Sequence, residues 1–222
     1  MLHPPLKPLG DQAVLAYLPD EASAVRFASA VRAADFPWLV DVVPAYATVG
    51  VYFDPEKTNL KGVRAALAAI RPASGPAAAE GRTLAIPCCY ELQLDLARVS
   101  EHLQLAPERV IDLHTAREYM VYAIGFCPGF PYLGYLPPAL TGVPRLPTPR
   151  LRVEPGSVGL TGRQTGLYPL ARPGGWNLIG CTPLELVNVE DGYFPIRVGD
   201  RVRFFRIDRA EYERLKGNRL KS

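Results

Sequence analysis

The sequence predicts an α+β protein with two domains, a ferredoxin-like α/β sandwich in residues 1–80 and a β-barrel or β-sandwich domain in residues 81–222. Three observations lead to this prediction. Apolar periodicities in the first part follow the order strand-helix-strand-strand-helix-strand. The stretch PASGPAAAEG at 72–81, which lacks large apolar residues, is typical of a domain boundary. Beyond Tyr119, short strand patterns separated by glycine and proline replace helical periodicity.

The elements of the first domain follow from apolar spacing and from capping residues. Apolar residues such as Val25, Ala28 and Val31 recur at helical spacing, and Asn59 is placed to cap a second helix. Pro44 is expected in the turn between two strands. The predicted elements are a strand at 12–18, a helix at 21–34, strands at 38–43 and 47–53, a helix at 60–70 and a strand at 83–89, which completes the ferredoxin-like sheet.

The second domain begins with two predicted helices and continues as strands. We expect helices at 92–103 and from 106 to 113, with Pro107 well placed in the first turn of the second one. The short strands that follow end with DRVRFFRI at 200–207. From Ala210 onward we expect a short charged helix that frays into solvent.

Composition and charge exclude several classes of protein. A net charge of +3 over 222 residues is too small for a nucleic-acid-binding protein. The start of the chain lacks the pattern of a secretory signal, and no apolar run reaches membrane-spanning length. The four cysteines form no CxxC pair, and adjacent Cys88 and Cys89 cannot bridge without distortion. We therefore expect a cytoplasmic protein with reduced thiols and no metal site of its own.

The most informative segment is residues 122–182, where glycine and proline are dense and aromatic residues remain frequent. Disordered segments of this composition lack the apolar area that offsets a backbone ordering cost of roughly 1–2 kcal/mol per residue. Here six aromatic side chains supply that area, so we expect ordered strands and turns. Between Pro128 and Pro183 there are five arginines and one carboxylate, Glu154. This balance predicts an anionic ligand or an acidic partner.

Two aromatic motifs in this segment allow a structural and a functional interpretation. In GFCPGFPYLGYLP at 125–137, Phe130 and Tyr132 flank glycines and could wall a ligand, or fill the core at a barrel corner. In RPGGWNLIG at 172–180, Trp176 could stack on a ligand, although buried tryptophans are commoner. Spacing alone favours the structural interpretation for both motifs.

The third motif, PGSVGLTGRQTGLYP at 155–169, combines glycines with hydroxyl and amide side chains. Exposed amides in such turns can form an anion-binding nest, although turns in a β-barrel have the same pattern. The chain contains neither GxxxxGK[ST] nor GxGxxG, so this is neither a P-loop nor a dinucleotide fingerprint.

Residue types that are missing restrict the chemistry that this chain can perform alone. His102 and His114 precede the motif region, so no Ser-His-Asp or His-Cys set is visible. Glu154 is the sole acid of the motif stretch, and a lone carboxylate is a poor site for Mg²⁺ and a nucleotide. If the chain takes part in phosphoryl or acyl chemistry, we expect another chain to complete the site.

Several long motifs resemble the KipI/PxpB family, also labelled allophanate hydrolase subunit 1 or carboxyltransferase subdomains C and D. They are PLGDQAVLAYL, EYMVYAIGFCPGFPYLGYLP, PRLRVEPGSVGLTGRQTGLYPLARPGGWNLIGCTPLEL and VGDRVRF, which recur in order over nearly the whole chain. The resemblance implies that the second domain is a cyclophilin-like β-barrel. It also implies a PxpB-type subunit of an ATP-dependent 5-oxoprolinase, which opens 5-oxo-L-proline to L-glutamate with PxpC/KipA-like and PxpA-like partners.

The same resemblance leaves two other functions open. One is inhibition of histidine kinase autophosphorylation, and the other is a biotin-dependent carboxyltransferase role on urea or allophanate. ATP and Mg²⁺ are expected at the level of the complex only, and the catalytic acid or base is not identified. The predicted substrate- and anion-binding residues are Phe130, Tyr132, Arg150, Gly156, Ser157, Gly159, Arg163, Gln164, Thr165, Gly166 and Trp176.

Overall fold

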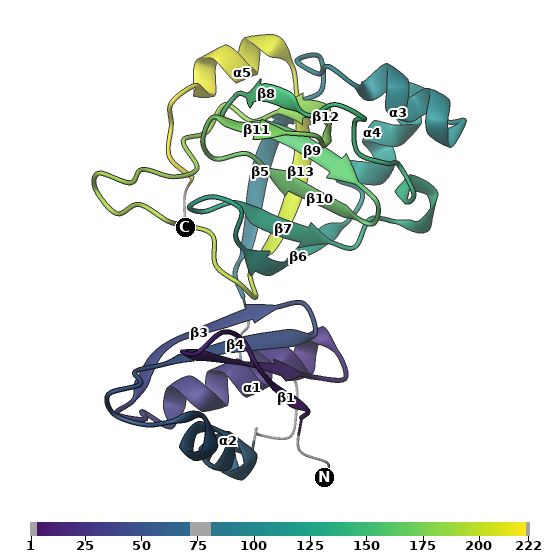
Figure 1. The fold of residues 1–222 in the computed structure, drawn as a ribbon. Helices are drawn as coiled ribbons and strands as arrows, with labels where there is room; N and C mark the ends of the chain where they lie inside the picture. Colours follow the sequence, from purple (N-terminus) through teal and green to yellow (C-terminus); the bar gives the residue numbers. More distant parts are fainter. Residues whose placement is uncertain (1–3, 72–80, 221–222) are drawn as a thin grey trace. The chain divides into compact units, whose positions relative to one another are not determined.

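A computed structural model describes residues 4–71 and 81–220 of the chain. The chain forms two compact units, Met1–Glu80 and Gly81–Ser222, each with its own apolar core (Figure 1). The boundary predicted at 72–81 lies, except for Gly81, outside the described residues.

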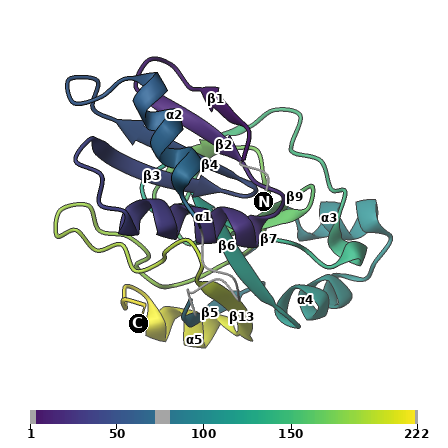
Figure 2. The ribbon, with the colours of Figure 1, turned by 90° about the horizontal axis from the view of Figure 1, so that it is seen from below.

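The first unit is a four-stranded antiparallel sheet with two helices packed on it (Figures 1 and 2). The strand order is β1-β2-β4-β3. Asp20 caps the first helix by accepting from the Ser23 amide at 2.6 Å, and Asn59 caps the second as predicted, accepting from Gly62 at 3.0 Å. The elements are β1 (Leu6–Pro8), β2 (Ala13–Tyr17), α1 (Glu21–Ala33), β3 (Leu39–Ala45), β4 (Thr48–Phe53) and α2 (Leu60–Ala69).

Two predictions for this unit are wrong. The strand at 83–89, expected to complete the sheet, belongs to the second unit, and the edge position beside β2 is taken by β1, whose three residues were too short a pattern to predict. Pro44 does not lie in the turn but pairs with Val49 inside β3. Because β3 is an edge strand, the missing proline amide costs no ladder bond. The turn is formed by Tyr46 and Ala47 instead.

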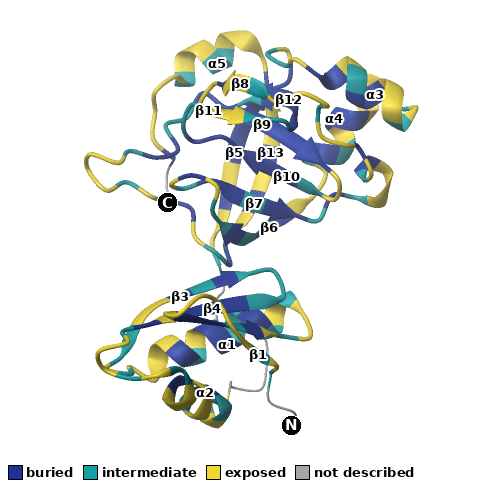
Figure 3. Cartoon of the chain, viewed as in Figure 1, coloured by how far each residue is buried: buried dark blue, intermediate teal, exposed yellow. Residues whose placement is uncertain are grey.

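The second unit is built on a closed seven-stranded barrel, which confirms the predicted β-barrel. Neighbouring strands follow the order β10-β7-β6-β13-β5-β12-β9, and only β5 and β13 pair in parallel. The barrel strands are β5 (Thr83–Cys89), β6 (Glu118–Ile124), β7 (Pro131–Gly134), β9 (Ser157–Thr161), β10 (Gln164–Leu167), β12 (Asn177–Cys181) and β13 (Arg201–Ile207). Side chains of the described strands fill the interior, which is dark blue in Figure 3.

Smaller elements cover the barrel. They are α3 (Leu96–Leu103), α4 (Pro107–Thr115), the 3₁₀ turn η1 (Pro138–Leu140), α5 (Arg209–Leu215) and a two-stranded ribbon of β8 (Arg150–Val153) and β11 (Arg172–Gly174). Helix α3 begins later than the predicted residue 92, because the amides of Leu94 and Asp95 both donate to the Leu178 carbonyl, at 3.2 and 2.9 Å. These bonds hold residues 92–95 as a loop against β12.

The C-terminal segment does not fray into solvent as predicted. After α5 it folds back, and the Glu185 amide donates to the Asn218 carbonyl at 2.9 Å. Arg219 Nε donates to Glu185 at 2.7 Å, and Leu220 is buried in the main core. Charge at the sequence level could not reveal this contact because its partners are distant in the chain. Among the described residues, no helix is both long enough and apolar enough to cross a membrane.

Candidate ligand face of the barrel

The aromatic residues of the glycine-rich motifs gather into one cluster outside the main barrel core. Phe130 is its centre, with ring centroids 5.0 Å from Tyr132, 5.1 Å from Tyr168 and 5.5 Å from Trp176, all edge to face. Phe130 and Trp176 are buried, while Tyr132 is half-buried. Phe130 and Trp176 therefore pack chiefly against other rings, and of the three predicted wall residues Tyr132 is the most accessible to a ligand.

Two predicted ligand-binding glycines make room for these rings. Gly159 and Gly166 are paired across β9 and β10. A Cβ at Gly166 would lie 3.0 Å from Phe130, from the Pro131 carbonyl and from Trp176, and one at Gly159 would lie 3.1 Å from the Trp176 Cβ. These separations are shorter than ordinary packing contacts, so both positions exclude a side chain for reasons of ring packing.

Gly156 and Ser157 serve a tight turn. Gly156 has a φ of 86°, and its amide donates to the Tyr168 carbonyl at 2.7 Å while its carbonyl accepts from Thr182 at 2.8 Å. The amides of Gly156 and Ser157 both have partners within the fold, since Ser157 donates to the Glu154 carbonyl at 3.2 Å. They are therefore not free to form an anion nest. The side chain of Ser157 instead lines a pocket described below.

The predicted anion-binding arginines differ in their surroundings. Arg150 donates to Asp95 at 2.7 Å, and its Nη1 is a buried atom with no hydrogen-bond partner among the described residues. Arg163 is exposed, and its guanidinium lies 4.6 Å from the Tyr135 ring centroid. In the described part of the chain neither Arg163 nor Arg145 forms an ion pair. Arg163 thus has a charge available for an external anion, whereas Arg150 is largely committed to Asp95.

Arg145 adds a second available cation beside the aromatic cluster. Burial raises the pKa of Tyr132, and the positive charge of Arg145 opposes that shift. The pKa of Tyr168 is raised by burial in the same way, with Arg145 and Arg150 acting against it. Sequence analysis noted Arg145 only as one of five arginines; proximity to Tyr132 and Tyr168 distinguishes it. Arg145 and the half-buried Tyr132 define what we call the ligand face.

Thr165 points into the barrel and not toward the ligand face. Its hydroxyl donates to the Gly159 carbonyl at 2.9 Å, so it accepts from His114 Nε2 at 3.0 Å. His114 Nδ1 then accepts from the Tyr90 hydroxyl at 2.7 Å. Burial lowers the pKa of His114 to about 3, so the imidazole is neutral. This closed network is structural. Sequence analysis missed it because the helix that carries His114 lies 51 residues before Thr165.

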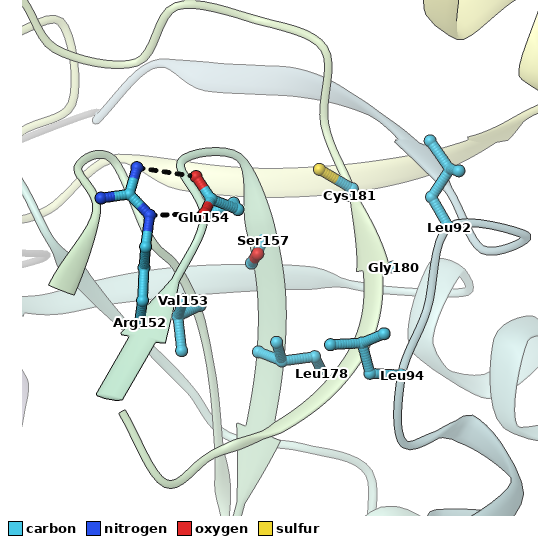
Figure 4. Close-up of a pocket in the computed structure, with 9 residues that line it drawn as sticks. All are labelled: Leu92, Leu94, Arg152, Val153, Glu154, Ser157, Leu178, Gly180 and Cys181. Atoms are coloured by element: carbon cyan, nitrogen blue, oxygen red, sulfur yellow. Dashed lines mark hydrogen bonds and ion pairs between the residues drawn. The ribbon is translucent and has the colours of Figure 1, made fainter. Parts of the chain in front are cut away.

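A pocket of about 220 Å³ adjoins the aromatic cluster, with which it shares Val153 and Leu178 (Figure 4). In Figure 4, Leu94 and Leu178 lie at one end, and Glu154 and Cys181 at the other. Glu154 accepts two bonds from Arg152, at 2.5 and 3.1 Å, which lowers the pKa of its carboxyl group. The lining residues are Leu92, Leu94, Arg152, Val153, Glu154, Ser157, Leu178, Gly180 and Cys181.

The donor atoms near the ligand face do not fit a bound Mg²⁺. Glu154 is engaged by Arg152, and both oxygens of Asp95 are engaged, one by Arg150 and one by the Leu178 amide. In residues 4–71 and 81–220, no three His, Cys, Asp or Glu side chains come together in a group that could hold a metal ion. A magnesium nucleotide bound near this face would need ligands from another chain.

The predicted site residues therefore divide into groups. Phe130, Gly159, Gly166 and Trp176 come together in the aromatic cluster, with Tyr132 at its accessible side. Gln164 is half-buried and Arg163 is exposed at the turn between β9 and β10. The remaining members, Arg150, Gly156, Ser157 and Thr165, lie in an ion pair, a turn, the adjoining pocket and the barrel interior.

Comparison with known proteins places the chain in a family. Residues 4–193 match the model of the carboxyltransferase domain, subdomains C and D. The chain is 35% identical to the B subunit of 5-oxoprolinase from Bacillus subtilis (strain 168), over 95% of this chain and 96% of that protein. It is 42% identical to the corresponding 5-oxoprolinase protein of Escherichia coli O157:H7, which has the same name, over 79% of this chain and 81% of that protein.

Solved structures agree with this assignment. The crystal structure of TTHA0988 is 37% identical, with a TM-score of 0.78 over 89% of this chain, and the chain spans only 40% of the TTHA0988 chain. The urea amidolyase of K. lactis has the same fold, at 18% identity and a TM-score of 0.76 over 97% of this chain and 16% of that chain. The family model and the full-length similarity together show that the chain belongs to the KipI/PxpB family of carboxyltransferase-domain proteins.

Proposed function

We propose that this chain is the PxpB-type subunit of an ATP-dependent 5-oxoprolinase, which opens 5-oxo-L-proline to L-glutamate together with PxpC/KipA-like and PxpA-like partners. The observation that carries the proposal is that three relatives, 35–46% identical, are each named as the B subunit of 5-oxoprolinase. The similarity to the urea enzymes, at 18–19% identity, concerns the fold and supports no particular substrate.

The chemistry of the substrate explains why several chains would be needed. A five-membered lactam is an unstrained, resonance-stabilised amide, so its hydrolysis at neutral pH calls for activation of the carbonyl oxygen. Phosphorylation by ATP would supply that activation, and it requires cations and hydrogen-bond donors that stabilise phosphate and carboxylate oxygens. Arg163 and Arg145 are suited to that task, because neither has an ion-pair partner among the described residues. Metal ligands and proton-transfer groups are assigned to the partners.

The proposal is tested by reconstitution. The chain alone, the chain with its PxpC/KipA-like partner, and all three subunits together are incubated with 5-oxo-L-proline and ATP, and L-glutamate is measured. We expect turnover with three subunits and little with fewer. Absence of glutamate with all three subunits soluble and assembled would overturn the proposal. Activity that disappears when biotin is sequestered would favour the carboxyltransferase function instead, and lowered autophosphorylation of a histidine kinase would favour the regulatory one.

A further inference from the structure

The pocket beside the aromatic cluster is walled mainly by apolar side chains, and exposed leucines extend it outward. Leu94, at one end of the pocket, is 68% exposed. Leu151, which directly precedes the pocket residues Arg152 and Val153 on β8, is 93% exposed. Single exposed leucines are ordinary on a protein surface. Two of them at one apolar pocket form a continuous surface that is typical of an interaction site.

The polar groups at the pocket do not favour a free charged ligand. Arg152 and Glu154 satisfy each other through two hydrogen bonds, so together they contribute no net charge. Burial raises the pKa of the Cys181 thiol, which is therefore neutral at pH 7. An apolar centre with a self-neutralised ion pair at its edge matches the hydrophobic core and polar rim of a protein interface.

The walls of this pocket are held together before any partner arrives. The amides of Leu94 and Asp95 donate to the carbonyl of Leu178, whose own amide donates to Asp95 Oδ2 at 2.7 Å. Asp95 in turn binds Arg150 at the start of β8. The loop at 92–95, β8 and β12 are thus joined by hydrogen bonds around one side chain. A preformed pocket loses little conformational entropy when it is filled.

We propose that this leucine surface, defined as Leu92, Leu94, Leu151, Val153 and Leu178, is where a second subunit docks, inserting one large apolar side chain into the pocket. The inference rests on the proposed function, because it requires a partner subunit. A volume of about 220 Å³ suits a single side chain and is below the roughly 300–1,000 Å³ of small-molecule sites. Leu94 and Leu151 extend outward beyond what a small molecule would cover.

The comparisons also favour a subunit as the occupant. The relatives carry the designation of a subunit, and in TTHA0988 the region matching this chain is joined to a longer polypeptide. Docking here has a consequence for the ligand face. Because Val153 and Leu178 belong to both the pocket and the aromatic cluster, the partner would lie directly beside that cluster. It could then add the carboxylates and proton-transfer groups that the ligand face lacks.

The experiment measures the affinity of the purified chain for its PxpC/KipA-like partner by titration calorimetry. We expect Leu94→Asp and Leu151→Asp each to raise the Kd about ten-fold or more, because each places a charge in a desolvated interface. Val189→Asp is the matched control, since Val189 is 58% exposed in the same unit but outside the leucine surface. Its Kd should change by less than about two-fold. Leu151→Ser and thermal unfolding curves verify that any loss reflects binding and not folding.

Several outcomes would overturn the inference. These are unchanged affinity in both aspartate variants, no binding by the unmodified chain, self-association of the chain that Leu94→Asp abolishes, or binding of 5-oxo-L-proline to the chain alone that Leu94→Asp abolishes. The readout is independent of turnover. A complex that binds through the leucine surface but forms no glutamate contradicts the proposed function alone. A complex that forms glutamate while both variants bind normally contradicts the docking inference alone.

Discussion

Arg150 and Asp95 form an ion pair that joins three separate segments of the barrel unit. Arg150 Nη2 donates to Asp95 Oδ1 at 2.7 Å, and the Leu178 amide donates to Oδ2 at the same distance. The Asp95 side chain is only 7% exposed, so its charge depends on these two donors. The arginine that sequence motifs assigned to ligand binding thus neutralises a buried carboxylate and anchors β8.

Replacing Arg150 should therefore affect stability. Arg150→Ala leaves Asp95 buried without its cation, and we expect a loss of about 2–3 kcal/mol in the free energy of unfolding, less than for a fully buried pair because part of Arg150 is exposed. Urea denaturation measures the loss. Arg214→Ala is the control, because Arg214 also pairs with a glutamate, Glu211, but at the surface, and should cost under about 1 kcal/mol. Equal losses in the two variants would show that the Asp95 pair has no special role.

Gly166 should tolerate no side chain. In Gly166→Ala the new methyl group would lie 3.0 Å from Phe130 and Trp176, and overpacking of this kind costs about 1–3 kcal/mol. Gly125→Ala is the matched control, since its Cβ would lie 3.7 Å from Tyr132, an ordinary contact. Thermal unfolding followed by tryptophan fluorescence compares the two. If Gly166→Ala is as stable as Gly125→Ala, the aromatic cluster is looser than the structure shows.

His114 should make the protein less stable in mild acid. Its pKa is lowered by burial to about 3 in the folded state, against 6.5 for the unfolded chain. Above pH 6.5 both states are neutral. As the pH falls below 6.5 the unfolded state binds a proton that the folded state excludes, and stability declines by up to about 1.4 kcal/mol per pH unit. Urea midpoints at about pH 7.5 and pH 5 measure this decline.

His114→Phe serves as the reference for that experiment, because it removes the titrating group while keeping a buried ring. The variant loses the bonds to Tyr90 and Thr165, so it is expected to be less stable at every pH. Its stability should nevertheless change much less than that of the unmodified chain between the two pH values. A parallel pH dependence in both proteins would assign the effect to other groups, such as the exposed His102.

Arg163 should affect activity and not folding. Its guanidinium is exposed and stacked on Tyr135, an interaction worth about 0.5–1 kcal/mol at a surface. We expect Arg163→Ala to leave unfolding nearly unchanged and to lower kcat/KM of the assembled complex for 5-oxo-L-proline about ten-fold or more, as for a lost charge-assisted contact. Arg214→Ala is again the control. Full activity in Arg163→Ala would place the anion site elsewhere.

Local signals predicted most individual elements correctly. Capping by Asn59, the helix starting at Pro107 and the strand at 201–207 depend on neighbouring residues, whose spacing is visible in one dimension. The pairing of the strand at 83–89 was not visible, because its apolar pattern fits a ferredoxin-like sheet and a barrel equally well. Whether it pairs with β13 is decided by a strand more than a hundred residues later.

The sequence by itself determined the class of elements, the enrichment of arginine over acid in the motif region, and membership of a family whose motifs recur in order. Only the tertiary structure decided what each motif residue does. Glycine spacing is the same whether a Cβ would meet a ligand or the ring of Trp176, and an arginine is the same in the sequence whether it faces solvent or Asp95. These alternatives differ in contacts between distant segments, and such contacts exist only once the barrel has closed.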